Sequence, residues 1–348
     1  MKNIKMIIST VLVTTMVGAL LTGCGASSKS AAGDNSSSAE VTDITAYGVI
    51  DPQISAQQII ADKKGYFKEE GLNVTNKLLQ SGGDLSPLIS GGSADVSFES
   101  TYTDVSLAAN NVGVKILAPM SNSGNTQCLV AGKNANINNA KDLEGKKVGI
   151  ASGAAVLIAI RNMCKDLGVD ANKIKFVTLA PSDQISSLEK GDIDAMACWE
   201  PWVSNAVKAG GKLLFSGLKS YLPEKQGDVE WLNFYTTFQV TDSFLKKNPK
   251  TCAAMVRALS KATDFISNNP DEAAEIISAE INIDKDQVKD IMSKNKYSMK
   301  IDQSFVDASN QIADFMLESG NIKKKPDYNS YIDSSVLKGE KSDYVSVN

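Results

Sequence analysis

The chain has 348 residues, of which 43% are hydrophobic and 22% charged, and its formal net charge is −4 at pH 7. This is the composition of a globular protein with more than one hydrophobic core, and two domains are expected. A mildly acidic chain with Arg161 and Arg257 as its arginines argues against nucleic acid or an anionic membrane surface as a partner. Histidine is absent, which removes the commonest general base and metal ligand and weighs against an enzyme.

The N-terminal segment has the features of a sorting signal. Two lysines precede an uncharged, largely apolar run at residues 6–21, which is short for a membrane span, and small residues follow it. The sequence Leu21-Thr22-Gly23-Cys24 resembles the end of a bacterial lipoprotein signal. That resemblance implies cleavage before Cys24 and a diacylglyceryl group on its thiol. The alternative is an ordinary signal peptide with an incidental cysteine.

The predicted N-terminal organisation is a signal peptide at residues 1–23, then the lipidated Cys24 with a flexible tether through residue 41. The tether is rich in Gly, Ala, Ser and Asn, which is typical of a mobile coil. The protein is thus expected at the cell membrane, lipid-anchored on the extracytoplasmic face. The other cysteines are widely separated and lie in apolar contexts, which favours buried thiols over disulfides: Cys128, Cys164, Cys198 and Cys252.

Strands and helices alternate through the first half of the body. Apolar runs predict strands at residues 44–49, 72–79, 95–98 and 114–119, with helices beginning near residues 56, 84 and 104. Asp84 is placed to cap the second of these helices. This alternation, with turns rich in Gly, Ser, Thr and Asp after the strands, favours a mostly parallel sheet covered by helices.

A second unit repeats the plan. Strands are predicted at residues 126–131, 147–150, 174–179, 193–198, 212–215 and 234–240. One helix is predicted at 154–167, and a second one follows the turn at 180–183 and ends at residue 188. Arg161 and Lys165, four residues apart, mark the solvated face of the first helix, so Arg161 is not expected to contact a ligand. The remaining pattern is helical, at residues 243–268, 271–280, 284–294 and 303–318.

The stretch from Gly191 to Trp202 is the most informative part of the chain. Its apolar run fits a buried parallel strand that stops at Pro201, which places Trp199 and Glu200 at the carboxyl end of that strand. Ligands of open α/β sheets bind outside those ends. An indole beside a carboxylate offers a stacking face and an acceptor for an amine, hydroxyl or amide. The alternative is a core tryptophan with a solvated glutamate.

Familiar catalytic motifs do not occur in the sequence. It has neither a G-x-S-x-G elbow nor a P-loop, and without histidine it can form neither an H-E-x-x-H site nor a Ser-His-Asp triad. Gly82-Gly83 is only a weak phosphate-loop signal. The turns at the strand ends instead expose helix N-terminal amides beside small hydroxyls, which suits a cleft that tolerates anions or zwitterions.

Four blocks together resemble the substrate-binding lipoproteins of ABC importers for aliphatic sulfonates, taurine and nitrate: residues 61–74 (ADKKGYFKEEGLNV), 88–98, 142–149 and 188–202. The resemblance implies the type II periplasmic-binding-protein fold. That fold has two α/β lobes with mostly parallel sheets joined by two crossover strands, here near residues 124–128 and 234–240. Lobe 1 would comprise residues 42–125 and 238–348, and lobe 2 residues 126–237.

The family's ligand contacts come from the strand-end turns. Carried onto this sequence, they predict a ligand-binding set made of Gln53, Gly82, Gly83, Ser100, Thr101, Tyr102, Ser152, Gly153, Ala154, Trp199 and Glu200. The chain departs from the family pattern in having Ala154-Ala155 where many relatives have polar residues, and Glu200 where a shorter aspartate is common. No metal or other cofactor is expected.

The resemblance implies a monomer that captures a small polar solute, such as an aliphatic sulfonate or taurine, and delivers it to an ABC permease with its ATPase. A donor-bearing solute is expected to outrank nitrate because of Glu200. The alternative ligand is a thiamine-pyrimidine precursor, on which Tyr102, Trp199 and Tyr235 could stack. A related pyrimidine-synthesising enzyme depends on histidine and a Cys-rich motif, which this chain lacks. A lipid-anchored scaffold protein would have no closed cleft.

Overall fold

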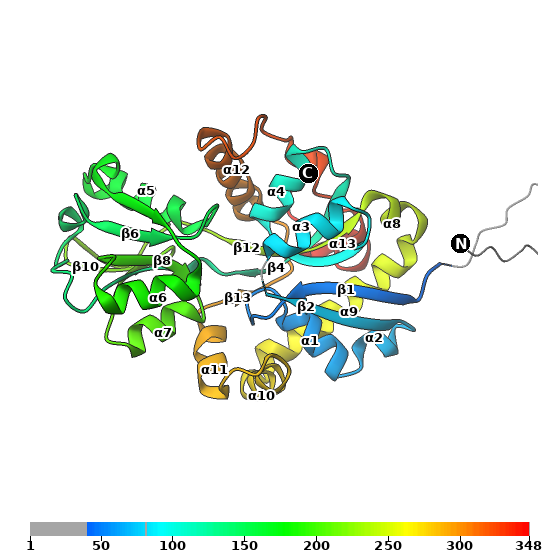
Figure 1. Ribbon diagram of the computed structural model, residues 1–348. Helices are drawn as coiled ribbons and strands as arrows, with labels where there is room; N and C mark the ends of the chain where they lie inside the picture. The colour runs from blue at the N-terminus through cyan, green and yellow to red at the C-terminus, as the bar shows by residue number, and fades with distance from the viewer. Residues whose placement is uncertain (1–39, 81, 348) are drawn as a thin grey trace, which may run out of the picture. The chain divides into compact units, whose positions relative to one another are not determined.

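The computed structural model describes residues 40–80 and 82–347, and these residues form two β-sheets with helices on both faces (Figure 1). The predicted signal peptide, Cys24 and nearly all of the tether lie outside the described residues. None of the described helices combines the length and apolar character that a membrane crossing requires.

Sheet A has six strands. In spatial order they are β13 (Lys296–Tyr297), β4 (Val114–Asn122), β12 (Tyr235–Thr241), β3 (Val96–Ser100), β1 (Asp43–Val49) and β2 (Asn73–Leu79). Sheet B has seven strands. In spatial order they are β11 (Lys225–Asp228), β10 (Lys219–Leu222), β9 (Lys212–Ser216), β5 (Gln127–Ala131), β8 (Ala195–Trp199), β6 (Lys147–Ile150) and β7 (Lys175–Thr178).

Helices from both ends of the described chain cover sheet A. They are α1 (Ala56–Lys63), α2 (Tyr66–Glu69), α3 (Gly82–Ser90), α4 (Thr101–Ala109), α8 (Asp242–Lys247), α9 (Pro249–Asn268), α12 (Gln303–Glu318) and α13 (Ser335–Glu340). Helix α10 (Pro270–Ile281) packs on α1 and α9, and α11 (Lys285–Ser293) packs on α10. Sheet B has α5 (Val156–Leu167) on one face, and α6 (Pro181–Lys190) and α7 (Trp202–Lys208) on the other (Figure 1). The helix predicted at 154–167 ends where expected, because Gly168 adopts the left-handed conformation with φ 68° that caps a helix.

The predicted fold class is confirmed, and in each sheet most strands run in one direction, with an antiparallel strand inserted among them. Strands β1, β2, β3 and β4 run in one direction, and β12 lies antiparallel between β3 and β4. Sheet B repeats this arrangement, with β5 antiparallel between β8 and β9. The physical reason is the chain's path between the sheets: each sheet takes in one strand that arrives from the other sheet, and this strand runs opposite to its neighbours.

The chain passes from sheet A to sheet B after β4 and returns before β12. The first passage lies in the predicted segment, whereas the second falls at residues 229–234, just before the predicted one, which forms β12. The proposed lobe boundaries at 125/126 and 237/238 stay a prediction. The hairpin of β10 and β11 was not predicted. Strand β10 alternates exposed and buried residues over only four positions, and β11 has no buried residue.

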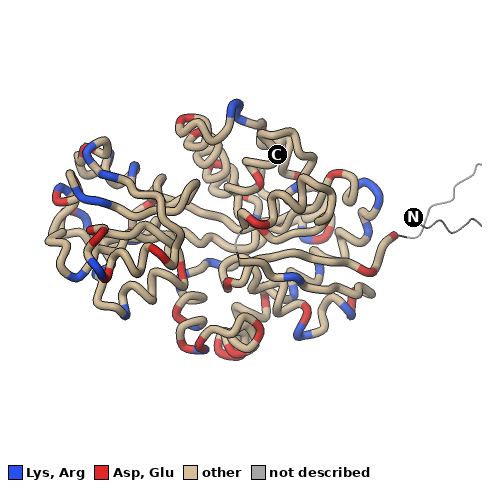
Figure 2. The backbone as a smooth tube through the Cα atoms, in the orientation of Figure 1, with Lys and Arg blue, Asp and Glu red and all other residues tan. Residues whose placement is uncertain are grey.

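The central strands carry few charges and are almost wholly buried. Strands β5, β8 and β12 have no charged residue, and Figure 2 shows charges gathered mainly on the surrounding helices and loops. Burying this apolar surface drives the folding of both sheets. The four described cysteines are buried free thiols, as predicted. Burial raises the pKa of Cys198 and of Cys252 to about 12, which leaves both thiols protonated near neutral pH.

Candidate functional site

The loop after β1 is built to hold Gln53. Asp51 accepts hydrogen bonds from the backbone amides of Gln53 at 2.9 Å and Ile54 at 2.7 Å, which closes a tight turn. Burial raises the pKa of Asp51 to about 7. The Gln53 carbonyl in turn accepts from the hydroxyls of Ser121 at 3.0 Å and Thr236 at 3.1 Å. Strands β4 and β12 of sheet A, which border the two passages of the chain between the sheets, therefore fix the backbone of Gln53.

The side chain of Gln53 contacts the end of sheet B. Its Nε2 donates to the backbone carbonyl of Glu200 at 2.9 Å. Its Oε1 is buried and has no hydrogen-bond partner among the described residues. A buried amide oxygen without a donor is costly, so this atom marks a place where a bound molecule would supply one.

The turn from β3 into α4 brings several predicted residues together. The Ser100 hydroxyl lies 3.5 Å from that of Thr103, and the Thr101 hydroxyl donates to the carbonyl of Tyr235 at 3.3 Å. The Tyr102 hydroxyl is hydrogen-bonded to the side-chain amide of Asn321. Thr101 is thus a structural link to β12, while Tyr102 packs against the edge of the core and binds Asn321.

Gly82 and Gly83 begin α3 beside this turn. A Cβ added at Gly82 would lie 3.3 Å from both Glu99 Oε2 and Thr103 Oγ1. Gly83 is exposed. The absence of a side chain at Gly82 therefore lets the start of α3 approach the end of β3 closely.

The predicted turn after β6 approaches α4. Ser152 and Gly153 are exposed and Ala154 is half-buried. Gly153 has φ 73°, and a Cβ added there would lie 3.1 Å from the hydroxyl oxygen of Tyr102. Gly153 therefore needs both the left-handed backbone and the small volume of glycine. Tyr102 and Gly153, which follow strands of different sheets, lie side by side.

Trp199 is the last residue of β8 and pairs with Gln127 of β5. It is half-buried and packs on the cluster between sheet B and α6 and α7, which includes Met196 and Val203. This position is compatible with both interpretations of Trp199, a core residue and a stacking face. Its role in ligand binding stays a prediction.

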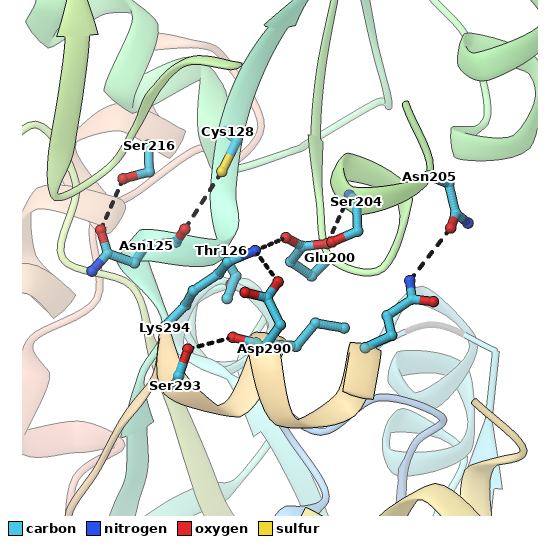
Figure 3. Close-up of polar contacts among 12 residues, drawn as sticks. Asn125, Thr126, Cys128, Glu200, Ser204, Asn205, Ser216, Asp290, Ser293 and Lys294 are labelled. Carbon is cyan, nitrogen blue, oxygen red and sulfur yellow. Dashed lines mark hydrogen bonds and ion pairs between the residues drawn. The ribbon is translucent and has the colours of Figure 1, made fainter. Parts of the chain in front are cut away.

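Glu200 is completely buried and its polar atoms are all engaged (Figure 3). Its Oε1 lies 2.6 Å from Lys294 Nζ, and its Oε2 accepts from the backbone amide of Ser204 at 2.9 Å. Its own amide donates to the carbonyl of Thr126 at 3.2 Å, and its carbonyl accepts from Gln53. The role of Glu200 as a ligand contact stays a prediction, but within the protein its carboxylate already has a cation and an amide.

Lys294 comes from the C-terminal helical region, directly after α11. It also lies 2.7 Å from Asp290, and the same helix reaches α7 through Gln287, whose Nε2 donates to Asn205 at 3.3 Å (Figure 3). Burial by itself would lower the pKa of Lys294, but Glu200 and Asp290 raise it above its usual value. No local sequence signal could have paired two residues so far apart in the chain.

Two buried acidic residues at the other end of the site were missed. Glu99 precedes Ser100, and Asp104 accepts from the Thr237 hydroxyl at 2.6 Å. Burial raises the pKa of Asp104 to about 8 and, together with the like charge of Asp104, raises that of Glu99 well above its ordinary value. A smaller opposite effect comes from the Thr103 hydroxyl. The signal was present: Glu99 lies near the carboxyl end of β3 and Glu200 directly follows β8, each after an aromatic residue.

The described contacts therefore connect Gln53 with Glu200, Tyr102 with Gly153, and Gly82 with the turn of Ser100. Gly83, Ser152, Ala154 and Trp199 belong to the same strand-end turns, and no polar side-chain contact joins them to that set. Within residues 40–80 and 82–347, no group of three or more His, Cys, Asp or Glu side chains is arranged to hold a metal ion.

The two sheets and the strands exchanged between them have the fold of the type II periplasmic binding proteins, and structural similarity agrees with this fold. The periplasmic aliphatic sulphonate binding protein SsuA from Escherichia coli superposes with a TM-score of 0.71 at 15% identity, covering 84% of this chain and 92% of that one.

The NMT1/THI5-like family model matches residues 54–273, and the chain belongs to this family. A Bacillus subtilis relative named "Putative aliphatic sulfonates-binding protein" is 26% identical over 329 residues, which are 92% of each chain. A Saccharomyces cerevisiae relative, 4-amino-5-hydroxymethyl-2-methylpyrimidine phosphate synthase THI13, is 26% identical over 218 residues, covering 62% of this chain and 64% of that protein. The predicted family resemblance is confirmed.

Proposed function

We propose that this protein is an extracytoplasmic solute-binding protein that captures an aliphatic sulfonate or a taurine-like solute. The observation that carries the proposal is Gln53, which is anchored by β4 and β12, contacts the end of β8, and keeps a buried Oε1 without a described donor. The similarity to sulfonate-binding proteins supports the choice of solute.

Capture is coupled to closure. A solute held between the turns of sheets A and B binds the closed form better than the open form, so it shifts the equilibrium toward closure. The contacts of Gln53 with Glu200 and of Tyr102 with Gly153 join the two sets of turns in the described conformation. We expect the closed form to dock on an ABC permease driven by a separate ATPase.

The same proposal places the protein on the outer face of the membrane through lipid on Cys24. The variant Cys24→Ser should move the protein from the membrane fraction to the soluble fraction. Matched immunoblots of both fractions measure this, with Cys128→Ser as the control because Cys128 is buried in sheet B. Membrane association of Cys24→Ser after complete signal cleavage would contradict lipid anchoring.

A second candidate is a binder of a thiamine-pyrimidine precursor. It is favoured by the pyrimidine phosphate synthase relative and by Tyr102, a half-buried ring at the start of α4 beside Gly153. The synthase relative also keeps a pyrimidine-forming enzyme as a minor candidate, against which the lack of histidine weighs.

A thermal-unfolding screen over alkanesulfonates, taurine, nitrate, amino acids and pyrimidines tests the proposal. A bound solute stabilises by about 2.7 kcal/mol at a hundredfold excess over its Kd, so a true ligand raises Tm visibly. Gln53→Ala should reduce the increase. A panel that leaves Tm unchanged overturns capture of these solutes and favours the scaffold class, whereas an increase confined to pyrimidines selects the second candidate.

A further inference from the structure

Glu99 is a buried residue of the site, and neither oxygen of its carboxyl group forms a well-defined hydrogen bond within the described residues. It lies at the carboxyl end of β3 and its residue exposure is 0%, although the Thr103 hydroxyl is close enough to oppose the rise in its pKa. Two oxygens of a carboxylate can accept several hydrogen bonds. A structure that buries them without partners loses stability unless a molecule supplies donors.

The surroundings of Glu99 point its carboxyl group toward the strand-end turns. Its Oε2 lies under the first residue of α3, where a Cβ at Gly82 would be 3.3 Å away. The Thr103 hydroxyl lies at the same 3.3 Å from that added Cβ. Because β1 and β3 are neighbours in sheet A, the unpartnered Gln53 Oε1 belongs to a loop at the same edge of the sheet.

The titratable neighbour of Glu99 is another carboxyl group. Asp104 is the charged group that acts on it, and it carries the same sign. Lys294, the cation that pairs with the glutamate at the end of sheet B, is bound to Glu200 and Asp290. An ammonium or other N–H donor placed next to Glu99 would satisfy its oxygens and favour its ionised form, whereas a sulfonate has no donor to offer them.

We propose that Glu99 is the specificity-determining residue of this site and selects solutes that carry an amine or similar N–H donor over solutes with the same acid group and no such donor. The inference rests on the proposed function and names its solute class: an aminoalkanesulfonate-like zwitterion rather than a simple alkanesulfonate. The turn hydroxyls and amides then face the acid group, and Glu99 and the unpartnered Gln53 Oε1 face the amine.

Matched ligands test this directly. Taurine and ethanesulfonate differ by one amino group, and their Kd values are measured by isothermal titration calorimetry on the wild type and on Glu99→Gln. Wild type should bind taurine at least about tenfold tighter, because a hydrogen bond to a charged group discriminates by that much or more. Glu99→Gln should bring the ratio of the two Kd values close to one.

Two further variants keep the test independent of folding. Gly82→Ala places a methyl group beside Glu99 Oε2 and should weaken taurine more than ethanesulfonate. Gln239→Met is the control, because Gln239 also has a buried Oε1 without a described partner but lies within β12. It should lower Tm without changing the ratio of the two Kd values.

The outcomes separate the inference from the proposed function. Wild type that binds ethanesulfonate as tightly as taurine overturns the inference and leaves sulfonate capture intact. A taurine preference that survives both Glu99→Gln and Gly82→Ala overturns it as well. Wild type that binds neither sulfonate overturns the proposed sulfonate function and the inference with it. Loss of preference in Glu99→Gln, with the preference retained in Gln239→Met, supports the assignment.

Discussion

Glu99 and Glu200 occupy equivalent places in the two sheets and have opposite surroundings. Each follows an aromatic residue at the carboxyl end of a buried strand, and each is 0% exposed. The carboxylate of Glu200 is bound by Lys294 and by the first turn of α7, whereas that of Glu99 has no described hydrogen-bond partner. Tertiary partners, and not the strand-end motif, therefore decide whether such a carboxylate holds the protein together or is open to a solute.

The difference has an energetic basis. A buried carboxylate can be stabilised by an opposite charge, or it can become protonated through a raised pKa. Glu200 follows the first course through Lys294. Glu99, beside Asp104, follows the second, and its pKa is raised well above the ordinary value.

The aromatic residues before the two glutamates offer the largest expected effect. Phe98 is fully buried and stacks on Phe238 with ring centroids 5.3 Å apart, whereas Trp199 is half-buried. Phe98→Ala should lower the free energy of unfolding by about 3 to 5 kcal/mol. Trp199→Ala should cost less stability but weaken ligand binding by about 1 to 3 kcal/mol if the indole stacks on the solute.

Chemical denaturation and calorimetry on the same two variants measure these effects. Equal losses of stability, with ligand affinity unchanged in Trp199→Ala, would assign Trp199 to the core and end its role as a stacking face.

Removing the cation of Glu200 is expected to have the next largest effect. Lys294→Met leaves a buried carboxylate without its counter-charge and should cost about 3 kcal/mol of unfolding free energy. Lys289→Met is a matched control, because Lys289 forms an equally short ion pair with Asp271 at 2.6 Å, but both side chains are more than half exposed. It should cost less than about 1 kcal/mol.

Urea denaturation at constant ionic strength compares the two lysine variants. Similar small losses for both would show that Glu200 does not depend on Lys294, and the contrast between Glu99 and Glu200 would disappear.

The raised carboxyl pKa values predict the direction of the pH dependence. Asp51 and Asp104 have pKa values of about 7 and about 8, and the pKa of Glu99 is raised as well. The native state therefore binds more protons than the unfolded state between about pH 4 and pH 8. The stability that these groups contribute is complete below their unfolded pKa values and is lost as pH rises through the folded ones.

Melting curves from pH 5 to pH 8 test this expectation. Glu99→Gln and Asp104→Asn should each make the decline of stability with pH shallower, by up to about 1.4 kcal/mol per pH unit. A decline in the wild type that neither substitution reduces would show that these carboxyl groups are ionised in the native protein.

The smallest expected effect concerns the links that fix Gln53. Ser121→Ala removes one of the two hydroxyl donors to the Gln53 carbonyl and leaves that of Thr236. The loss of stability should be about 1 kcal/mol, since a second donor remains. Ligand affinity should fall less than in Gln53→Ala, and an equal fall would mean that Gln53 acts mainly through its backbone.

The sequence by itself determined the alternation of strands and helices, the family, and the turns in which candidate residues occur. These follow from local patterns: the apolar run ending at Trp199, the glycine that ends α5, and the polar residues after each strand. The motif around Glu200 also predicted correctly that a strand ends at this point, since β8 ends at Trp199. The same pattern at Glu99 was equally visible in the sequence.

Only the tertiary structure decided the direction of β5 and β12, the contact of Tyr102 with Gly153, and the pairing of Glu200 with Lys294. Each depends on residues that lie far apart in the chain and meet only when two sheets exchange strands. The charge state of a buried carboxylate depends on its nearest partners within a few ångströms, and no local pattern contains them. That is why two glutamates with the same local setting are assigned different roles.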